Sequence, residues 1–112
     1  MVRWKIDYYD VPSGKKPVEE FINEQRVEIR ARYVGMIDFL EEYGPFLSGK
    51  YTKKIRKDLY ELRITSQEQI RVLYAIQGRT IILLHAFKKK TQKIPLKEIK
   101  TALLRLDKIL HI

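Results

Sequence analysis

The stretch DLYELRITSQEQIRVLYAIQGRTIILLHAF, residues 58–87, decides the fold because it holds three successive strand patterns. Residues 58–64 and 69–76 alternate between apolar and polar side chains, which is the period of a half-buried strand. Residues 80–87 are apolar on both faces, so we expect a central strand that is covered on both sides. The glycine at position 78 predicts a hairpin turn between the second and third strands.

The flanking segments add one strand and three helices. Residues 2–9 alternate like a half-buried strand, and we expect this strand to pair at an edge of the sheet. Residues 17–43 predict two helices packed as a hairpin, with a break near residues 25–27 and a stop at Gly44-Pro45. Residues 95–110 have the apolar spacing of an amphipathic helix.

Residues 44–54, between the helical hairpin and the three strands, are expected to form a loop. The order of elements is then β-α-α-β-β-β-α. This order predicts an α+β fold: a small twisted antiparallel sheet with an N-terminal helical hairpin and a C-terminal helix. The length of 112 residues suits a single domain that spans residues 1–112.

The composition argues against several classes of protein. The chain has no cysteine, which excludes disulfides and thiolate metal sites and favours a reducing, cytoplasmic location. We see no signal peptide, and no apolar stretch approaches the ~20 residues of a membrane span, so we expect no membrane partner. The two histidines, His85 and His111, have no neighbours at metal-ligand spacing. We therefore expect no metal and no other cofactor, since the chain also lacks a P-loop and a nucleophile elbow.

The positive charge is concentrated in one part of the sequence. The chain carries a net charge of +9, and residues 50–93 hold eight lysines and four arginines against three acidic residues. Outside this window, basic and acidic residues balance, so the window accounts for the whole excess. A generally basic surface would spread the charge more evenly, and the asymmetry favours a binding face for a polyanion.

Arg63 and Arg71 are the candidate centre of that face. Each is a lone arginine inside a predicted strand, and the two guanidiniums would project from one side of the sheet if their strands are neighbours. Guanidinium groups bind phosphate in a bidentate manner, and lysine adds a compact charge. The lysines that flank these strands are Lys53, Lys54, Lys57, Lys88, Lys89, Lys90 and Lys93.

Each of these residues also has a purely structural interpretation. A strand arginine is more often a solvent-face residue with a carboxylate partner, and Glu61 is a partner within reach of Arg63. A run of lysines such as Lys88–Lys90 is usually a solvated turn. By strand alternation His85 shares a face with Leu83 and Phe87, which would make it a core histidine. The functional interpretation therefore depends on the whole group of residues.

Three segments of the chain, LYELRI, IRVLYAI and IILLHAFKKKTQKIPLKEIKTA, resemble the RelE-type toxins of bacterial type II toxin–antitoxin systems. Within this RelE/ParE superfamily, the sequence looks most like the phage-derived, HigB-like branch. The resemblance covers roughly residues 2–105, and its most specific part is HAFKKKTQKIP.

The resemblance implies a compact ribonuclease that cleaves messenger RNA in the ribosomal A site without a metal and so inhibits translation. The implied reaction is attack of a 2′-hydroxyl on the adjacent phosphate. This step needs a base for the hydroxyl, positive charge for the phosphorane and an acid for the leaving 5′-oxygen. By resemblance, Arg71 binds the scissile phosphate, Arg63 helps to activate the hydroxyl, and Lys89 supports the leaving group. RNA binding falls to Lys53, Lys54, Lys57, Lys88, Lys90 and Lys93.

The sequence departs from well-studied relatives at two points. It has Lys93, Ile94 and Pro95 where those members carry a tyrosine, and Glu61 where some carry a second basic residue. The general base is therefore open between His85 and a lysine whose pKa is lowered by neighbouring cations.

The resemblance also implies partners. We expect a small helix-turn-helix, HigA-like antitoxin that binds the protein, and contact with operator DNA only through that antitoxin. The ribosome and its mRNA are the expected targets. Two rival hypotheses are a non-catalytic nucleic-acid-binding module on the same scaffold and a protein-interaction domain whose lysines meet an acidic partner.

Overall fold

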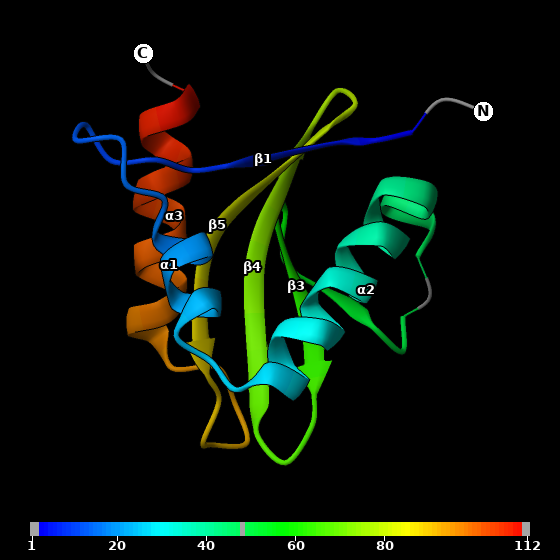
Figure 1. The fold of residues 1–112 in the computed structure, drawn as a ribbon. Helices are drawn as coiled ribbons and strands as arrows, with labels where there is room; N and C mark the ends of the chain where they lie inside the picture. The colour runs from blue at the N-terminus through cyan, green and yellow to red at the C-terminus, as the bar shows by residue number, and fades with distance from the viewer. Residues whose placement is uncertain (1–2, 48, 111–112) are drawn as a thin grey trace.

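The computed structural model describes residues 3–47 and 49–110 (Figure 1). In chain order the elements are β1 (Lys5–Tyr8), α1 (Pro17–Asn23), α2 (Val27–Tyr43), a 3₁₀ turn η1 (Gly44–Phe46), β2 (Thr52–Arg56), β3 (Leu59–Thr65), β4 (Gln69–Gln77), β5 (Thr80–Lys88) and α3 (Leu96–Leu110). The predicted α+β class is confirmed, and so are the two N-terminal helices and the C-terminal helix. The expected start of the first strand at Val2 lies outside the described residues. None of the helices in the described part of the chain combines the length and the apolarity needed to cross a membrane.

The five strands form one sheet in the order β1-β5-β4-β3-β2. Strands β2 to β5 pair as antiparallel neighbours, whereas β1 runs parallel to β5. The expected edge position of β1 is confirmed, but the expectation of a wholly antiparallel sheet is wrong. The alternation of side chains fixes which residues face the core and carries no information about the direction of the neighbouring strand.

Strand β2 is an addition to the predicted order, because residues 44–54 were expected to form a loop. It pairs with the first half of β3 and lies at the edge of the sheet. Its sequence, TKKIR, has exposed charged residues at three of five positions. Lysine-rich edges of this kind discourage pairing with other chains, and the same charges hide the strand from a search for apolar alternation.

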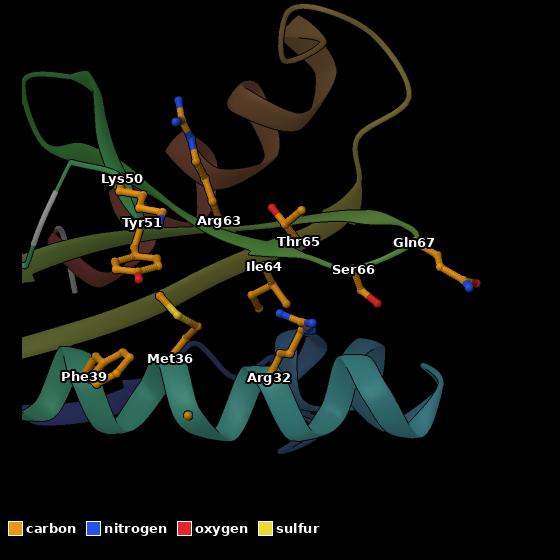
Figure 2. Close-up of a pocket in the computed structure, with 11 residues that line it drawn as sticks. Arg32, Met36, Phe39, Lys50, Tyr51, Arg63, Ile64, Thr65, Ser66 and Gln67 are labelled. Carbon is orange, nitrogen blue, oxygen red and sulfur yellow. The ribbon is translucent and has the colours of Figure 1, made fainter.

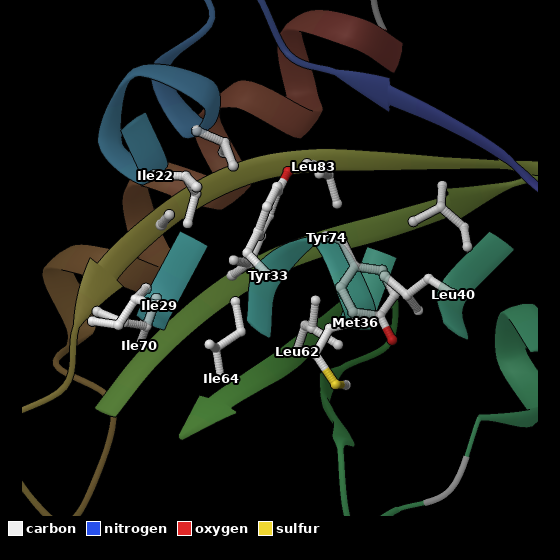
Figure 3. Packing of buried hydrophobic residues seen from close by; sticks show 14 residues of the cluster. Ile22, Ile29, Tyr33, Met36, Leu40, Leu62, Ile64, Ile70, Tyr74 and Leu83 are labelled. Atoms are coloured by element: carbon white, nitrogen blue, oxygen red, sulfur yellow. The ribbon is translucent and has the colours of Figure 1, made fainter. Parts of the chain in front are cut away.

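Two apolar cores lie on opposite faces of the sheet. Helices α1 and α2 pack on one face, where Ile29, Leu40, Leu62 and Leu83 are almost completely buried (Figure 3). Helix α3 packs on the other face through its own apolar side chains, against sheet residues such as Leu73. Strand β5 is buried on both faces, so the prediction of a central, doubly covered strand is confirmed.

Gly44 ends α2 as the sequence predicted. Its φ of 53° lies in the left-handed region that favours glycine. A Cβ atom at this position would also collide with the ring of Trp4, which packs beside the end of the helix. The backbone N–H of Trp4 donates to the carbonyl of Glu41 at 2.8 Å, which joins the start of the chain to the last turn of α2.

A register shift in β5 changes the face on which His85 lies. Leu73 of β4 is opposite His85, but the next residue, Tyr74, is opposite Leu83, so Leu84 is an extra residue in β5. Leu83 therefore packs with the α1/α2 core, while Leu84 and Phe87 pack beneath α3. The expectation that His85 shares a face with Leu83 is wrong, because a β-bulge reverses the alternation at this point.

Candidate active site

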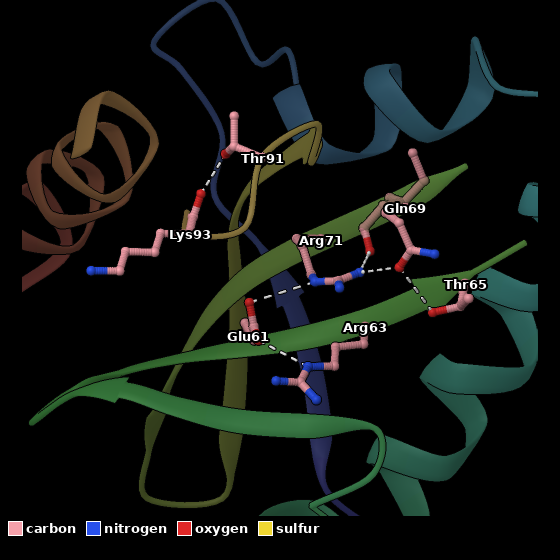
Figure 4. Close-up of polar contacts among 8 residues, drawn as sticks. Glu61, Arg63, Thr65, Gln69, Arg71, Thr91 and Lys93 are labelled. Carbon is pink, nitrogen blue, oxygen red and sulfur yellow. Dashed lines mark hydrogen bonds and ion pairs between the residues drawn. The ribbon is translucent and has the colours of Figure 1, made fainter. Parts of the chain in front are cut away.

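Arg63 and Arg71 occupy directly opposite positions on β3 and β4. Opposite residues of an antiparallel pair project to the same face, so the prediction that these two arginines share one side of the sheet is confirmed. Figure 4 shows both side chains on this face with Glu61 beside them. The local pattern explains the arrangement: Glu61 and Arg63 alternate with Leu62 and Ile64, and those two residues are buried in the opposite core.

Glu61 joins the two arginines. Its Oε1 atom accepts a hydrogen bond of 2.9 Å from Nε of Arg63. Its Oε2 atom forms an ion pair with Nε of Arg71 at 3.7 Å, which is beyond hydrogen-bond reach. The pairing of Glu61 with Arg63 is a confirmed prediction. The contact with Arg71 was not anticipated, although the facing position of the two arginines was a signal from which it could have been found.

Burial differs sharply among the three side chains. Glu61 is 2% exposed and the side chain of Arg71 is 8% exposed, whereas the side chain of Arg63 is 33% exposed. Burial lowers the pKa of Arg71, Glu61 opposes this shift, and Arg63 adds to it. A guanidinium nevertheless stays protonated in proteins, so Arg71 is a fixed cation and not a proton donor. A phosphate would therefore approach from the side of Arg63.

Hydrogen bonds fix the orientation of the Arg71 guanidinium. Its Nη1 atom donates to the carbonyl of Ile70 at 3.1 Å and to Oε1 of Gln69 at 3.3 Å. The same Gln69 oxygen accepts from the hydroxyl of Thr65 at 3.3 Å. The Nε atom of Arg71 makes no hydrogen bond among the described residues and faces Oε2 of Glu61. These contacts hold the guanidinium in place before any ligand binds.

The lysines near β2 lie on different faces. Lys53 is opposite Glu61, so by alternation it shares the face of the two arginines. Lys54 is opposite Tyr60, whose ring packs against the α1/α2 core, so it belongs to the other face. Lys57 lies in the turn between β2 and β3 and is exposed. Of these three lysines, strand register thus places only Lys53 beside the arginines.

The two lysines Lys88 and Lys89 at the end of β5 also lie on different faces of the sheet. Lys88 is opposite Ile70 on the α1/α2 face, and its ammonium pairs with the carboxylate of Glu68 at 2.8 Å. The backbone N–H of Lys89 donates to the carbonyl of Gln69 at 2.7 Å, so the strand register continues one residue beyond β5. Alternation then places Lys89 on the face of Arg71.

Lys90 and Lys93 lie in the exposed loop between β5 and α3. The carbonyl of Lys93 accepts a hydrogen bond from the hydroxyl of Thr91, which shapes the loop (Figure 4). Both lysines are thus available at the margin of the sheet without a fixed position beside the arginines. The RNA-binding and catalytic roles of all these residues stay predictions.

His85 lies beneath α3 with both ring nitrogens engaged. Its Nε2 atom is 2.9 Å from Oε1 of Glu98, and Nη1 of Arg105 is 3.3 Å from its Nδ1 atom. Arg105 also donates to the carbonyl of Leu84 at 2.7 Å. Because Arg105 has only donors, Nδ1 must accept, and the ring proton belongs to Nε2, which donates to Glu98.

Burial lowers the pKa of His85, although Glu98 opposes this shift, and the neutral form with a proton on Nε2 is consistent with that direction. A histidine that serves as a general base needs an unoccupied nitrogen directed at the substrate. In this arrangement the ring instead connects β5 to α3. Its proposed catalytic role is a prediction that requires α3 to release one of the two nitrogens.

The arrangement as a whole is suited to an anion. Two guanidiniums and, by register, two lysines face the same side, and one buried carboxylate pairs with both arginines. No three histidine, aspartate or glutamate side chains within residues 3–47 and 49–110 converge to hold a metal ion. The chemistry that the described residues provide is fixed positive charge for an anion.

The fold and this cluster define a small α+β protein with a basic face on its sheet. Residues 20–107 match the family described as phage-derived protein Gp49-like (DUF891). This match covers most of the chain, so the protein belongs to the Gp49-like family, which is part of the RelE/HigB-like toxin superfamily. A search of curated proteins finds no match. The resemblance is thus confirmed for the superfamily, and the HigB-like branch stays a prediction.

Proposed function

We propose that this protein is the toxin of a type II toxin–antitoxin system and that it cleaves messenger RNA on the ribosome. The observation that carries the proposal is the facing pair Arg63 and Arg71, held by the buried carboxylate of Glu61, in a chain of the Gp49-like family. The cytoplasm, where ribosomes and mRNA meet, is the proposed location.

The proposed reaction is an internal transfer at one phosphate. The 2′-oxygen attacks the adjacent phosphorus and gives its proton to a base, the bond from phosphorus to the 5′-oxygen breaks, and the 5′-oxygen takes up a proton. The products are a 2′,3′-cyclic phosphate and a free 5′-hydroxyl. No metal is needed for this balance of atoms and electrons.

The roles follow from position and charge. Arg71, held by Ile70 and Gln69, binds the scissile phosphate and stabilises the charge of the phosphorane. Arg63 is more exposed and lies beside the attacking hydroxyl, which it polarises. Lys89, on the same face by register, supports the leaving oxygen. The general base is either a lysine of this basic face or His85 after it leaves Glu98.

The proposed partners carry negative charge that complements this basic surface. A small helix-turn-helix antitoxin binds the protein, and acidic segments of such a partner would neutralise the basic face. Operator DNA is contacted only through that antitoxin. The other lysines, at positions 53, 54, 57, 88, 90 and 93, would meet RNA of the message or of the ribosome.

The test uses induced expression in bacterial cells, followed by mapping of the 5′ ends of cellular transcripts. We expect the wild-type chain to arrest growth and to produce new, codon-spaced 5′ ends. Arg71→Ala should lower cleavage by roughly 10²–10³-fold and relieve the arrest, since one preorganised donor to a developing oxyanion contributes that much. Arg30→Ala, an exposed arginine on α2, is the matched control and should behave as wild type.

Two results would contradict the proposal. Growth arrest by Arg71→Ala as strong as that by the wild type would remove the assigned site. Unchanged transcript ends, together with salt-sensitive retention of RNA by the purified protein, would instead favour the non-catalytic binding module.

A further inference from the structure

A groove of about 880 Å³ lies between α2 and the edge of β3 (Figure 2). Its α2 wall contains Arg32, Met36 and Phe39, which follow one another at helical spacing. Its other wall contains Tyr51 and residues 63–67. The volume falls within the range of about 300–1,000 Å³ that is typical of sites for small molecules. It is therefore large enough for a nucleotide.

The charged residues that line this groove all have the same sign. Arg32 and Lys50 supply this charge, because Arg63 borders the groove but its side chain points away from α2 (Figure 2). None of the lining residues in the described part of the chain is an aspartate or a glutamate. Planar guanidiniums and a compact ammonium are the groups that proteins use to hold phosphate. The groove therefore has the charge of a site for a phosphate-bearing ligand.

Aromatic rings accompany the cations. The ring centroids of Phe39 and Tyr51 are 6.1 Å apart, and Nζ of Lys50 lies over the Tyr51 ring at 5.7 Å from its centroid. Phe39 also lies near Tyr43, with ring centroids 6.4 Å apart, and it is still 41% exposed. Cationic grooves with exposed aromatic rings bind single-stranded nucleic acid, because a base stacks on the ring while cations follow the backbone.

Arg63 connects the groove to the proposed phosphate site. Its backbone N–H donates to the carbonyl of Tyr51 at 2.8 Å, so Tyr51 lies beside Arg63 just before the edge strand β2 begins. In Figure 2 the Tyr51 side chain points toward α2 and the Arg63 side chain points away from it. An RNA strand that crosses the edge of β3 would therefore pass from Arg63 on one face to Phe39 on the other.

We propose that this groove binds an unpaired base of the RNA strand whose neighbouring phosphate lies at Arg63 and Arg71. Phe39 stacks on the base, while Arg32 and Lys50 contact the flanking phosphates. The inference rests on the proposed function, and it extends the substrate site around the sheet edge. We commit to RNA as the occupant because Arg32 and Lys50 lie beside aromatic rings with no carboxylate among the described lining residues, and this combination of cations and rings is typical of sites for single-stranded nucleic acid.

The test measures binding of labelled oligonucleotides to the purified full chain by fluorescence anisotropy. The probes are 2′-O-methyl hexauridylate and hexaadenylate, which offer no 2′-hydroxyl for cleavage, and an abasic 2′-O-methyl hexamer with the same phosphates. Phe39→Ala should weaken binding of the base-bearing probes at least ~5-fold, and it should leave the abasic probe unaffected. Val34→Ala removes another exposed apolar side chain of α2 that lies outside the groove. It should change the Kd of neither the base-bearing probes nor the abasic probe.

A second pair of variants tests the phosphate contacts. Arg32→Glu should weaken binding of both kinds of probe, because the backbone is common to them. Arg30→Glu makes the same change of charge on an exposed α2 residue that does not line the groove, and its effect should be clearly smaller. Thermal unfolding by circular dichroism verifies that all four variants are folded.

The inference is overturned if Phe39→Ala and Val34→Ala give the same Kd, or if Phe39→Ala weakens the abasic probe equally. It is also overturned if a partner protein binds through Phe39 while none of the oligonucleotides does. Cleavage on ribosomes is measured alongside with unmodified mRNA. If the protein cleaves mRNA but Phe39→Ala does not change oligonucleotide binding, the groove proposal is rejected and the proposed enzyme activity is kept. If binding depends on Phe39 but no mRNA is cleaved, the enzyme activity is rejected and the groove is kept as an RNA site.

Discussion

Two polar clusters on the same face of the sheet, each with one carboxylate, differ in charge and in the elements that hold them. Glu61, Arg63 and Arg71 all belong to β3 and β4, so the sheet alone fixes them. Glu98 and Arg105 belong to α3 and close around His85 of β5. The first cluster holds two permanent cations and leaves Arg63 accessible, whereas the second surrounds a neutral ring. In our proposal the first cluster arranges charge for a ligand, whereas the second attaches α3 to the sheet.

The largest expected difference between the clusters is in stability. Glu61→Ala leaves the buried guanidinium of Arg71 without its carboxylate, and we expect the free energy of unfolding to fall by about 3–5 kcal/mol. Glu98→Ala leaves a neutral imidazole with one hydrogen bond fewer, which should cost about 1–3 kcal/mol. Urea denaturation followed by circular dichroism measures both. Equal losses would contradict the distinction between a charged and a neutral cluster.

A smaller effect should separate the two adjacent lysines at the end of β5. Lys89→Ala removes a cation from the face of Arg71, and we expect cleavage of ribosome-bound mRNA to slow by at least ~10-fold. Lys88→Ala removes a cation that pairs with Glu68 on the other face, so the cleavage rate should change little. Single-turnover rates with programmed ribosomes test this pair. A larger loss for Lys88→Ala would show that strand register does not identify the catalytic lysine.

The smallest expected effect concerns pH. Burial lowers the pKa of His85 below its usual value near 6.5, so the unfolded chain binds this proton more readily than the folded chain does. The contribution of His85 is therefore complete above about pH 6.5 and is lost as the pH falls toward the lower folded pKa. The slope from this one group cannot exceed about 1.4 kcal/mol per pH unit.

His85→Gln should remove this component of the pH dependence. Urea midpoints for the wild type and the variant, measured between pH 7.5 and pH 5, give the difference directly, because every other group, including His111, is common to both chains. If stability falls equally in the two chains as the pH is lowered, His85 is not buried in its neutral form.

The arginine face could be predicted from sequence because it depends on simple alternation. Glu61 and Arg63 alternate with buried Leu62 and Ile64, and successive strands joined by a short turn usually pair. The stop of α2 at Gly44-Pro45 was also predicted, and the expected break near residues 25–27 overlaps the observed one between Asn23 and Val27.

Other features had no comparable signal. The bulge at Leu84 lies in a strand that is apolar on both faces, so no polar residue marks the change of register that reassigns His85. The parallel pairing of β1 depends on contacts between Lys5–Tyr8 and a strand more than seventy residues later. The groove brings together Phe39 of α2 and Tyr51, which precedes β2, and neither residue belongs to a motif in the sequence.

The central claim is that the basic face directs a 2′-hydroxyl onto the neighbouring phosphate. The most direct measurement incubates the purified protein with ribosomes that carry an mRNA with a single 2′-deoxynucleotide at the mapped cleavage position. The account predicts that cleavage stops at this position and that the unmodified mRNA yields a 2′,3′-cyclic phosphate and a 5′-hydroxyl. Cleavage of the deoxy-substituted message at the same position and rate would contradict it.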